Sequence, residues 1–387
     1  MKAEITRGKR EIREMHAGSE RTAGGNAQPP LISQATGLHN PPPWLRDRVV
    51  RYVTSVETSP DDDLPFRDNP QPGAPANIET TVWALSCLRQ VGAQDAIDGA
   101  RPRALAALRA AYNPDLGIYE PNETQIGGGP GTWRMHFDAV VRIGFALLDE
   151  RPRPFPRGLA RLSALPWVPV GPVAWRPWLD QAWADDPRAA AKAAFQYLWY
   201  YTRFAGTNHV DDLDDQAQQV LAYLESRRDP ATGFVGMGPD VDVGWAMRGH
   251  RNLALNLLWP LGVEEPGVER MIDATLACQR PDGLFHDGGM CANMDAVHLL
   301  AEYGRRTPHR RAESIRSTRR CVAAMFRRLA SPDGGFFYEQ PERQATDPAN
   351  IHTTNGLAFA LFTLNYWQAL DPSARENLEE ALVGAEF

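Results

Sequence analysis

A short turn motif recurs along the chain and constrains its fold more than any other feature. Each copy places proline next to aspartate and runs into an aromatic residue, and four of the five copies contain glycine. The copies are SPDDDLPF (59–66), NPDLGIYE (113–120), DPATGF (229–234), RPDGLF (280–285) and SPDGGF (331–336). Their prolines are 54, 116, 51 and 51 residues apart, so a degenerate copy is expected near residue 172. This period predicts six structural repeats.

The segments between the turns have helical patterns of two kinds. An amphipathic, charged segment precedes the turns, as expected for surface helices; these segments are 43–56, 101–112, 214–227, 267–279 and 313–330. A more apolar segment follows each turn, and these segments are 78–90, 132–148, 189–204, 249–261, 293–303 and 351–367. Little of the chain alternates with period two, so strands are not expected.

Six hairpins of a charged and an apolar helix predict an all-α fold, the (α/α)6 toroid. The apolar helices would form an inner ring and the amphipathic helices an outer ring. An open solenoid would need polar capping repeats at both ends. We expect residues 1–40 to be a flexible N-terminal arm, 41–372 to form the toroid and 373–387 to be a C-terminal tail.

The turns also carry a family resemblance. An outer helix followed by CQRPDGLF or LASPDGGF and then an inner helix is similar to the repeat of terpenoid cyclases and of protein prenyltransferase β-subunits. The similarity covers roughly residues 43–370. It implies an α/α toroid whose central cavity performs cyclisation or prenyl transfer on an isoprenoid-type substrate.

Polar residues gather at the starts of the apolar segments. All six inner N-termini should open on one face of the ring, where convergent ionisable groups predict a site. The candidate catalytic residues are Glu79, Asp240, Asp242, Asp295, His298 and His352. The candidate substrate-binding residues are Trp83, Trp133, Arg134, His136, Arg248, His250 and Asn252. The alternative is that such residues pair as buried ladders, for example Arg134–Asp138–Arg142.

Cysteine, aspartate and histidine near the starts of the apolar segments are also possible metal ligands. Prenyltransferase β-subunits hold zinc with an Asp and a Cys near the start of one inner helix and a His near the start of a later one. By resemblance, Cys291, Asp295 and His352 would converge as zinc ligands with an open position for substrate. The Cys precedes the Asp by four residues, which departs from the family pattern. The alternative is a cysteine buried as a small hydrophobic residue.

The sequence DLDD, 212–215, is similar to the D-x-D-D acid motif of class II terpene cyclases. Here it precedes an outer helix, on the opposite face of the ring from the inner N-termini. Carboxylates are favoured at helix N-termini by capping and by the helix dipole. We therefore expect Asp212, Asp214 and Asp215 to be structural.

Composition narrows the function classes. A net charge of −7 without a long basic run argues against nucleic-acid binding. No apolar run is long enough to cross a membrane. Four scattered cysteines do not form a disulfide framework, which favours a reducing cytoplasm. The partner expected is a small-molecule or glycan substrate, and the sequence does not specify an oligomeric state.

The main functional prediction is an isoprenoid cyclase or prenyltransferase, with Arg134, Arg248 and Arg251 holding a diphosphate. One alternative is a carbohydrate-active lyase or hydrolase of the six-hairpin type. Glu79 with Asp295, or Asp240 with Asp242, would then act as acid and base. A non-catalytic binding toroid is a further alternative.

Overall fold

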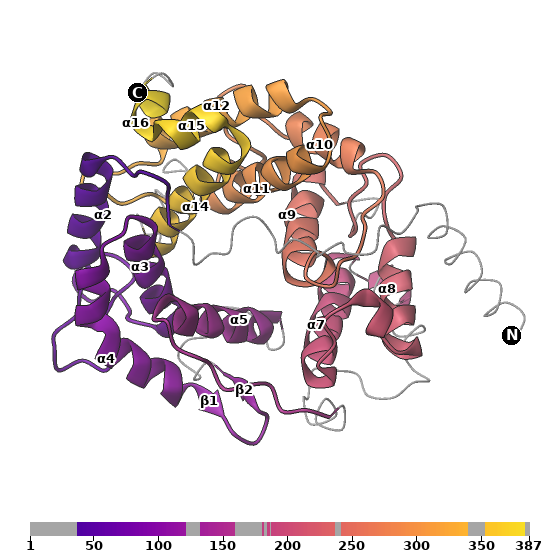
Figure 1. Cartoon of the computed structure of the whole chain (residues 1–387), viewed down its shortest axis with the longest axis horizontal. Coiled ribbons are helices and arrows are strands. Elements are labelled where there is room, and N and C mark those ends of the chain that lie inside the picture. Colours follow the sequence, from indigo (N-terminus) through magenta and orange to yellow (C-terminus); the bar gives the residue numbers. More distant parts are fainter. Residues whose placement is uncertain are drawn as a thin grey trace, which may run out of the picture.

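The chain forms a ring of helices in two layers, as Figure 1 shows for this computed structural model. The structure describes residues 37–120, 132–158, 180–181, 184–185, 187–236, 241–339 and 353–383. The inner layer consists of α3 (Ile78–Gln90), α5 (Thr132–Leu147), α7 (Pro187–Ala205), α9 (Val243–Leu253), α11 (Met290–Arg306) and α14 (Thr354–Leu370). The outer layer consists of α2 (Pro43–Ser55), α4 (Gln94–Ala110), α8 (Asp215–Ser226), α10 (Val268–Ala277) and α12 (Arg311–Arg328). The predicted all-α toroid is confirmed, and its degenerate turn near residue 172 lies outside the described residues.

The two layers differ in burial as the sequence pattern predicts. In α14 nearly every side chain is buried, and α3 and α11 are similar. In α2 only Leu45, Val49, Tyr52 and Val53 are buried, which gives one apolar face. The inner helices therefore form the core, and the outer helices cover it.

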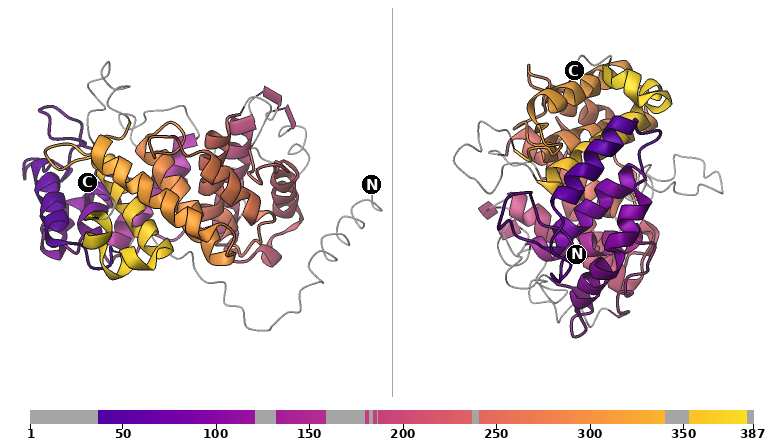
Figure 2. Two further views of the ribbon diagram at one scale, coloured as in Figure 1. Left: turned by 90° about the horizontal axis from the view of Figure 1, so that it is seen from above. Right: turned by 90° about the vertical axis from the view of Figure 1, so that its left-hand side faces the viewer.

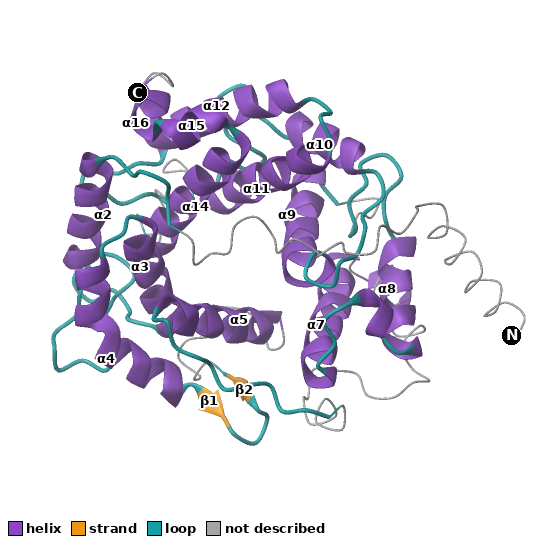
Figure 3. Cartoon of the chain, viewed as in Figure 1, coloured by secondary structure: helices purple, strands orange, loops and turns teal. Residues whose placement is uncertain are grey.

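The repeated turns share a backbone conformation that explains their glycines. Gly117, Gly233, Gly283 and Gly334 all have positive φ, between 73° and 106°, a region that glycine enters at no steric cost. Four copies close with a single antiparallel bridge, such as Gln279 with Phe285. In the copy at 113–120 the bridge is extended into β1 (Tyr112–Asn113) and β2 (Ile118–Tyr119) (Figure 3).

The ring closes where the last repeat meets the first. Both Figure 1 and Figure 2 show the indigo first unit beside the yellow last unit. The backbone N–H and the hydroxyl of Thr354, at the start of α14, donate to the carbonyl of Asp68, at 2.9 and 3.1 Å. Deeper in the seam, Asn365 donates to the side chain of Gln90 at 3.0 Å. These contacts join residues 286 and 275 positions apart.

Helix α9 begins earlier than the sequence pattern indicates. The apolar segment was expected from residue 249, whereas the helix starts at Val243 after the capping residue Asp242, whose side chain accepts from Gly244 N at 2.8 Å. After Leu253 the chain continues as a π-helical turn, η4 (Ala254–Leu258). The earlier start moves His250 from the first turn to the middle of the helix.

The structure describes most of the predicted C-terminal tail but not the first 36 residues of the chain. Residues 1–36 of the predicted arm lie outside the described residues. In the predicted C-terminal tail, α15 (Pro372–Glu376) and α16 (Leu378–Val383) bury Ala374, Leu378 and Leu382. Across the described ranges, no helix combines the length and apolar character needed to span a membrane.

The DLDD segment caps an outer helix, as predicted. Asp214 is the N-cap of α8, and its side chain accepts from Ala217 N at 2.9 Å. The preceding short helix η3 (Val210–Asp212) is tied to Leu261, beyond the C-terminal end of α9 and η4, by a bond from Val210 N. The segment therefore lies at the C-terminal ends of the inner helices, away from their N-termini.

Replacing Asp214 with alanine should lower the free energy of unfolding by about 1 kcal/mol, because the cap of α8 is lost. Asp214→Asn keeps the accepting oxygen and should unfold close to the wild type. Urea unfolding of the three proteins measures both effects. Equal destabilisation by the two substitutions would show that the charge of Asp214, and not its capping oxygen, stabilises the protein.

Candidate active site

The N-terminal turns of the inner helices and the loops before them form one face of the ring, which we call the mouth face. Contacts between successive loops establish it. The start of α14 bonds to the loop before α3 through Thr354 and Asp68. The start of α11 bonds to the loop before α14, from Met290 N to the carbonyl of Tyr338 at 2.8 Å. His286, in the loop before α11, contacts Asp242 before α9 at 3.1 Å.

Glu79 lies in the first turn of α3 on this face. Its Oε1 atom contacts His136 Nε2 of α5 at 3.1 Å and accepts from Trp83 Nε1 at 3.1 Å. Its side chain is about one-third exposed. Burial favours the neutral acid, but the bonds from His136 and Trp83 outweigh it and hold the pKa of Glu79 below its ordinary value. Glu79 is therefore a positioned carboxylate that stays ionised.

Asp68 lies in the loop immediately before α3 and is a second carboxyl at the same place. It is half-buried at the closing seam of the ring. Burial and the nearby charge of Glu79 raise the pKa of Asp68 to about 6, against a bond with Thr80 that lowers it. Two neighbouring carboxyls with pKa values moved in opposite directions are the usual arrangement of an acid and a base.

Asp68 was not among the residues selected from the sequence. The signal that could have found it is the one that selected Asp240 and Asp242, namely an acidic residue just before an inner helix. Its burial could not be foreseen, because Asp68 lies at the seam where the ring closes, and its main-chain carbonyl bonds to Thr354, 286 residues away along the chain.

An aromatic row leads from Glu79 along the mouth face. The ring of Trp83 packs edge-on against Phe359 of α14 at 5.4 Å, and Phe359 packs against Tyr338 at 5.8 Å. Tyr338 in turn interacts with Cys291 and Arg248. Trp83 itself is only 2% exposed, so its predicted substrate contact is corrected to a positioning role through its bond to Glu79.

Asp295 of α11 is buried between two arginines of α9. Its carboxylate lies 3.3 Å from Arg251 and 3.8 Å from Arg248. Arg248 also pairs with Asp287 at 3.2 Å. Burial raises the pKa of Asp295, and the two guanidiniums oppose that shift. The predicted acid pair of Glu79 with Asp295 is not formed, since Asp295 pairs with arginine and Glu79 pairs with histidine.

His298 is also buried, rather than facing a cavity as expected. Its ring stacks on Tyr366 at 4.0 Å, and its Nδ1 accepts from Arg251 at 2.9 Å. Burial and the charge of Arg251 hold the pKa of His298 well below its ordinary value. A neutral histidine in this position orients Arg251, so its predicted catalytic role is corrected to a structural one.

His250 does not reach the mouth face. Its side chain is fully buried between the layers, 2.8 Å from Glu265 and 2.9 Å from the hydroxyl of Tyr303. The early start of α9 explains this correction, because His250 is now two turns inside the helix. Asn252, by contrast, is exposed and accepts from Arg251 at 3.2 Å.

Four predicted site residues lie outside what the structure describes: Asp240 and His352 entirely, and Trp133 and Arg134 in their side chains. The proposed pair of Asp240 with Asp242 and the ladder from Arg134 to Asp138 therefore remain predictions. The second half of that ladder is present, because Asp138 pairs with Arg142 at 2.8 Å.

Two of the three predicted zinc ligands, Cys291 and Asp295, lie beside the arginines of α9. Cys291 lies 3.8 Å from Asp295, but both face Arg248 and Arg251. Burial raises the pKa of the Cys291 thiol to about 11, which opposes the thiolate that zinc requires. Among the described residues, no three His, Cys, Asp or Glu side chains are arranged to hold a metal. His352 is not placed, so the convergence of all three residues stays a prediction.

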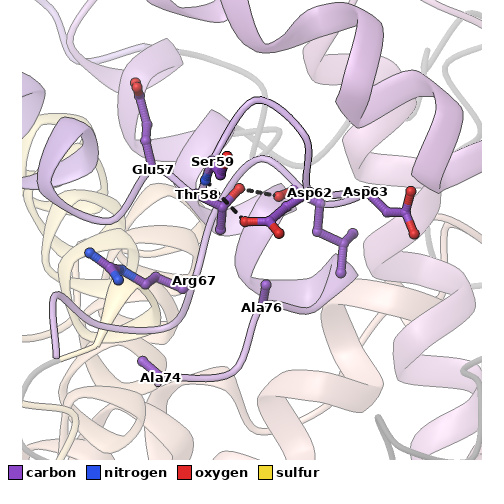
Figure 4. Close-up of a pocket in the computed structure, with 9 residues that line it drawn as sticks. Glu57, Thr58, Ser59, Asp62, Asp63, Arg67, Ala74 and Ala76 are labelled. Carbon is purple, nitrogen blue, oxygen red and sulfur yellow. Dashed lines mark hydrogen bonds between the residues drawn. The ribbon is translucent and has the colours of Figure 1, made fainter. Parts of the chain in front are cut away.

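A separate open hollow of about 440 Å³ lies in the loop between α2 and α3 (Figure 4). Its lining includes Glu57, Asp62, Asp63 and Arg67 but neither Asp68 nor Glu79. Arg103 donates to the carbonyls of Ser59, Asp62 and Leu64 in this loop, which fixes its shape. The hollow is therefore an outer feature of the turn and not the carboxyl pair.

Comparisons with known proteins give a fold-level likeness only. No protein-family model matches the sequence, and no curated protein matches it significantly. A solved structure, the GH76A α-1,6-mannanase from Salegentibacter sp. HEL1_6, is similar with a TM-score of 0.48 and 12% identity, over 85% of this chain and 99% of that chain. At this similarity the likeness does not extend to the activity. The cyclase and prenyltransferase families gain no support from it.

The raised pKa of Asp68 predicts a pH-dependent stability. The folded chain keeps this proton to higher pH than the unfolded chain does, so this carboxyl's contribution to the free energy of unfolding falls as pH rises from about 4 to about 6. Asp68→Asn removes that contribution. The stability of the variant relative to wild type should therefore increase across this pH interval, as measured by urea unfolding. A difference in unfolding free energy between Asp68→Asn and wild type that does not vary with pH would contradict the raised pKa of Asp68.

Proposed function

We propose that this chain is a carbohydrate-active hydrolase that cleaves glycosidic bonds at Asp68 and Glu79. The observation that carries the proposal is the divergence of the two pKa values, with Asp68 raised to about 6 and Glu79 lowered. Glycosidic hydrolysis uses such a pair, one carboxyl as acid and one carboxylate as base or nucleophile. Non-catalytic binding does not require a matched acid and base.

Each residue has a role that follows from its protonation state. Asp68 donates its proton to the glycosidic oxygen as the bond from that oxygen to the anomeric carbon breaks. Glu79 accepts the proton of the water that attacks the anomeric carbon. His136 and Trp83 orient Glu79 through Oε1, which leaves Oε2 for that water. The two sugar products carry the added hydrogen and hydroxyl. Glu79 then releases the proton it accepted to solvent, and Asp68 regains one from solvent.

The arginines of the site favour hydrolysis of a glycan over the other predicted reactions. Arg248 and Arg251, expected to hold a diphosphate, are already paired with Asp287 and Asp295. A lyase would need positive charge to neutralise a uronate carboxylate, and the described side chains offer no unbalanced cation of α9 for that purpose. This charge balance suits a neutral glycan better than a diphosphate or a uronate.

The proposal predicts loss of turnover when either carboxyl is removed. Asp68→Asn and Glu79→Gln should each lower kcat by about 10²–10⁴-fold, the contribution of general acid–base catalysis. Release of reducing ends from neutral polysaccharides and from aryl glycosides measures this. Asp214→Asn, at the opposite end of the inner helices, is the matched control and should retain wild-type turnover.

The pH profile gives a second readout of the same claim. Glu79 must be ionised and Asp68 protonated, so kcat/KM should fall above about pH 6 as Asp68 loses its proton. Full activity of both carboxyl variants, or an activity lost only in Asp214→Asn, would overturn the proposed function. An unsaturated uronate product, detected by its ultraviolet absorbance, would show that the enzyme is a lyase.

A further inference from the structure

Trp245 is exposed where an inner helix would be expected to bury its aromatic residues. Among the described residues, only Trp44 and Trp245 are exposed large hydrophobic side chains, at 38% and 37%. Trp44 belongs to the outer helix α2, whereas Trp245 lies in the first turn of α9, on the mouth face. An exposed aromatic ring on the same face as the carboxyl pair is a candidate binding surface.

The surroundings of Trp245 hold its ring in a defined orientation. The guanidinium of Arg248 lies 4.3 Å from its ring centre, and His286 packs edge-on at 5.4 Å. His286 fits only because residue 244 is glycine, since a Cβ there would lie 2.2 Å from the histidine Nδ1. The same Nδ1 contacts Asp242 at 3.1 Å. Two segments of the chain, the start of α9 and the loop before α11, therefore position this ring.

Trp245 is connected to the carboxyl pair by a row of touching side chains. Arg248 packs on Trp245 and interacts with the thiol of Cys291, which in turn interacts with Tyr338. Phe359 and Trp83 complete the row to Glu79. The row crosses the mouth face from α9 through α14 to α3. A ligand that reached both ends would be longer than one sugar ring, since several side chains separate them.

The charges around Trp245 indicate the chemistry of the ligand. Three carboxyls, Asp242, Asp287 and Asp295, face two guanidiniums, Arg248 and Arg251. These groups provide no excess positive charge, which a phosphate or uronate would require. The exposed carboxylate of Asp242, close to the aromatic ring of Trp245, instead suits sugar hydroxyls above an apolar sugar face.

We propose that Trp245 is the stacking platform of a distal subsite, so that the enzyme takes neutral oligosaccharides in preference to short glycosides. The inference rests on the proposed function for the position of bond cleavage. Arg248 and His286 hold the platform, and the exposed carboxylate of Asp242 is placed to accept hydrogen bonds from sugar hydroxyls.

The test compares Trp245→Ala with Trp44→Ala, the matched control on the outer ring. Wild type and variants are assayed on mono- to hexasaccharides of mannose, glucose and xylose and on their aryl glycosides. Trp245→Ala should lower the ratio of kcat/KM for the long to the short substrate about tenfold, mainly through KM, the size expected for one aromatic stacking contact. Trp44→Ala should keep the wild-type ratio, and Trp245→Phe should restore most of it.

The outcomes separate this inference from the proposed function. If wild type cleaves glycans and Trp245→Ala keeps the wild-type ratio, the platform is refuted and the function stands.

If wild type cleaves none of the substrates, affinity electrophoresis in gels containing neutral polysaccharide tests whether Trp245 binds glycan. Retardation of wild type and Trp44→Ala but not of Trp245→Ala would support the platform without the catalysis. Equal retardation of all three, no retardation, or a preference for polygalacturonate would overturn it. Circular dichroism checks that each variant is folded.

Discussion

The closure of the ring between α3 and α14 is the contact on which the rest of the structure depends. Thr354 binds the carbonyl of Asp68, and Asn365 binds Gln90, across 286 and 275 residues of chain. On the outer layer, Arg48 of α2 donates to the carbonyls of Ser331 and Gly334 in the last repeated turn. These bonds join the first unit to the last, so the apolar inner helices have neighbours on both sides and need no capping repeats.

The same closure creates the chemistry of the mouth face. Asp68 lies in the seam, where its main-chain carbonyl accepts bonds from Thr354. Burial there, together with the charge of Glu79, raises the pKa of its side chain. Glu79 is only one turn into α3, but the bonds from His136 and Trp83 keep it ionised. A structural requirement of the ring thus moves the pKa values of two neighbouring carboxyls in opposite directions. Asp295, which was selected from the sequence as a candidate catalytic residue, is instead paired with the arginines of α9.

Local features of the fold were predictable from the sequence because their causes are local. The glycines of the repeated turns mark backbone with positive φ, and the two kinds of helical segment differ in apolar content. Asp214 was expected to cap α8 from its position alone, and it does. The start of α9 was misplaced, at residue 249 instead of Val243, although the segment VGWAMR before Gly249 is mostly apolar and Asp242 is a local capping signal.

The candidate site was predicted only in part because partner choice is a long-range property. Glu79 and His136 were selected from the sequence, but their contact joins two inner helices. His250 and His298 have the residue type of a catalytic group, yet Glu265 and Arg251 respectively bind them in the core. Nothing in the local sequence distinguishes a histidine that faces the mouth from one that faces a buried partner.

The most direct test of the account is a carboxyl NMR titration of Asp68 and Glu79 in the folded protein labelled with carbon-13. The variants Asp68→Asn and Glu79→Gln are used to assign the two signals. The account predicts that Asp68 titrates near pH 6 and Glu79 below its ordinary range. It also predicts that Glu79→Gln lowers the pKa of Asp68, because one of the two causes of its rise is removed. Two carboxyls that titrate together at ordinary values would contradict the account.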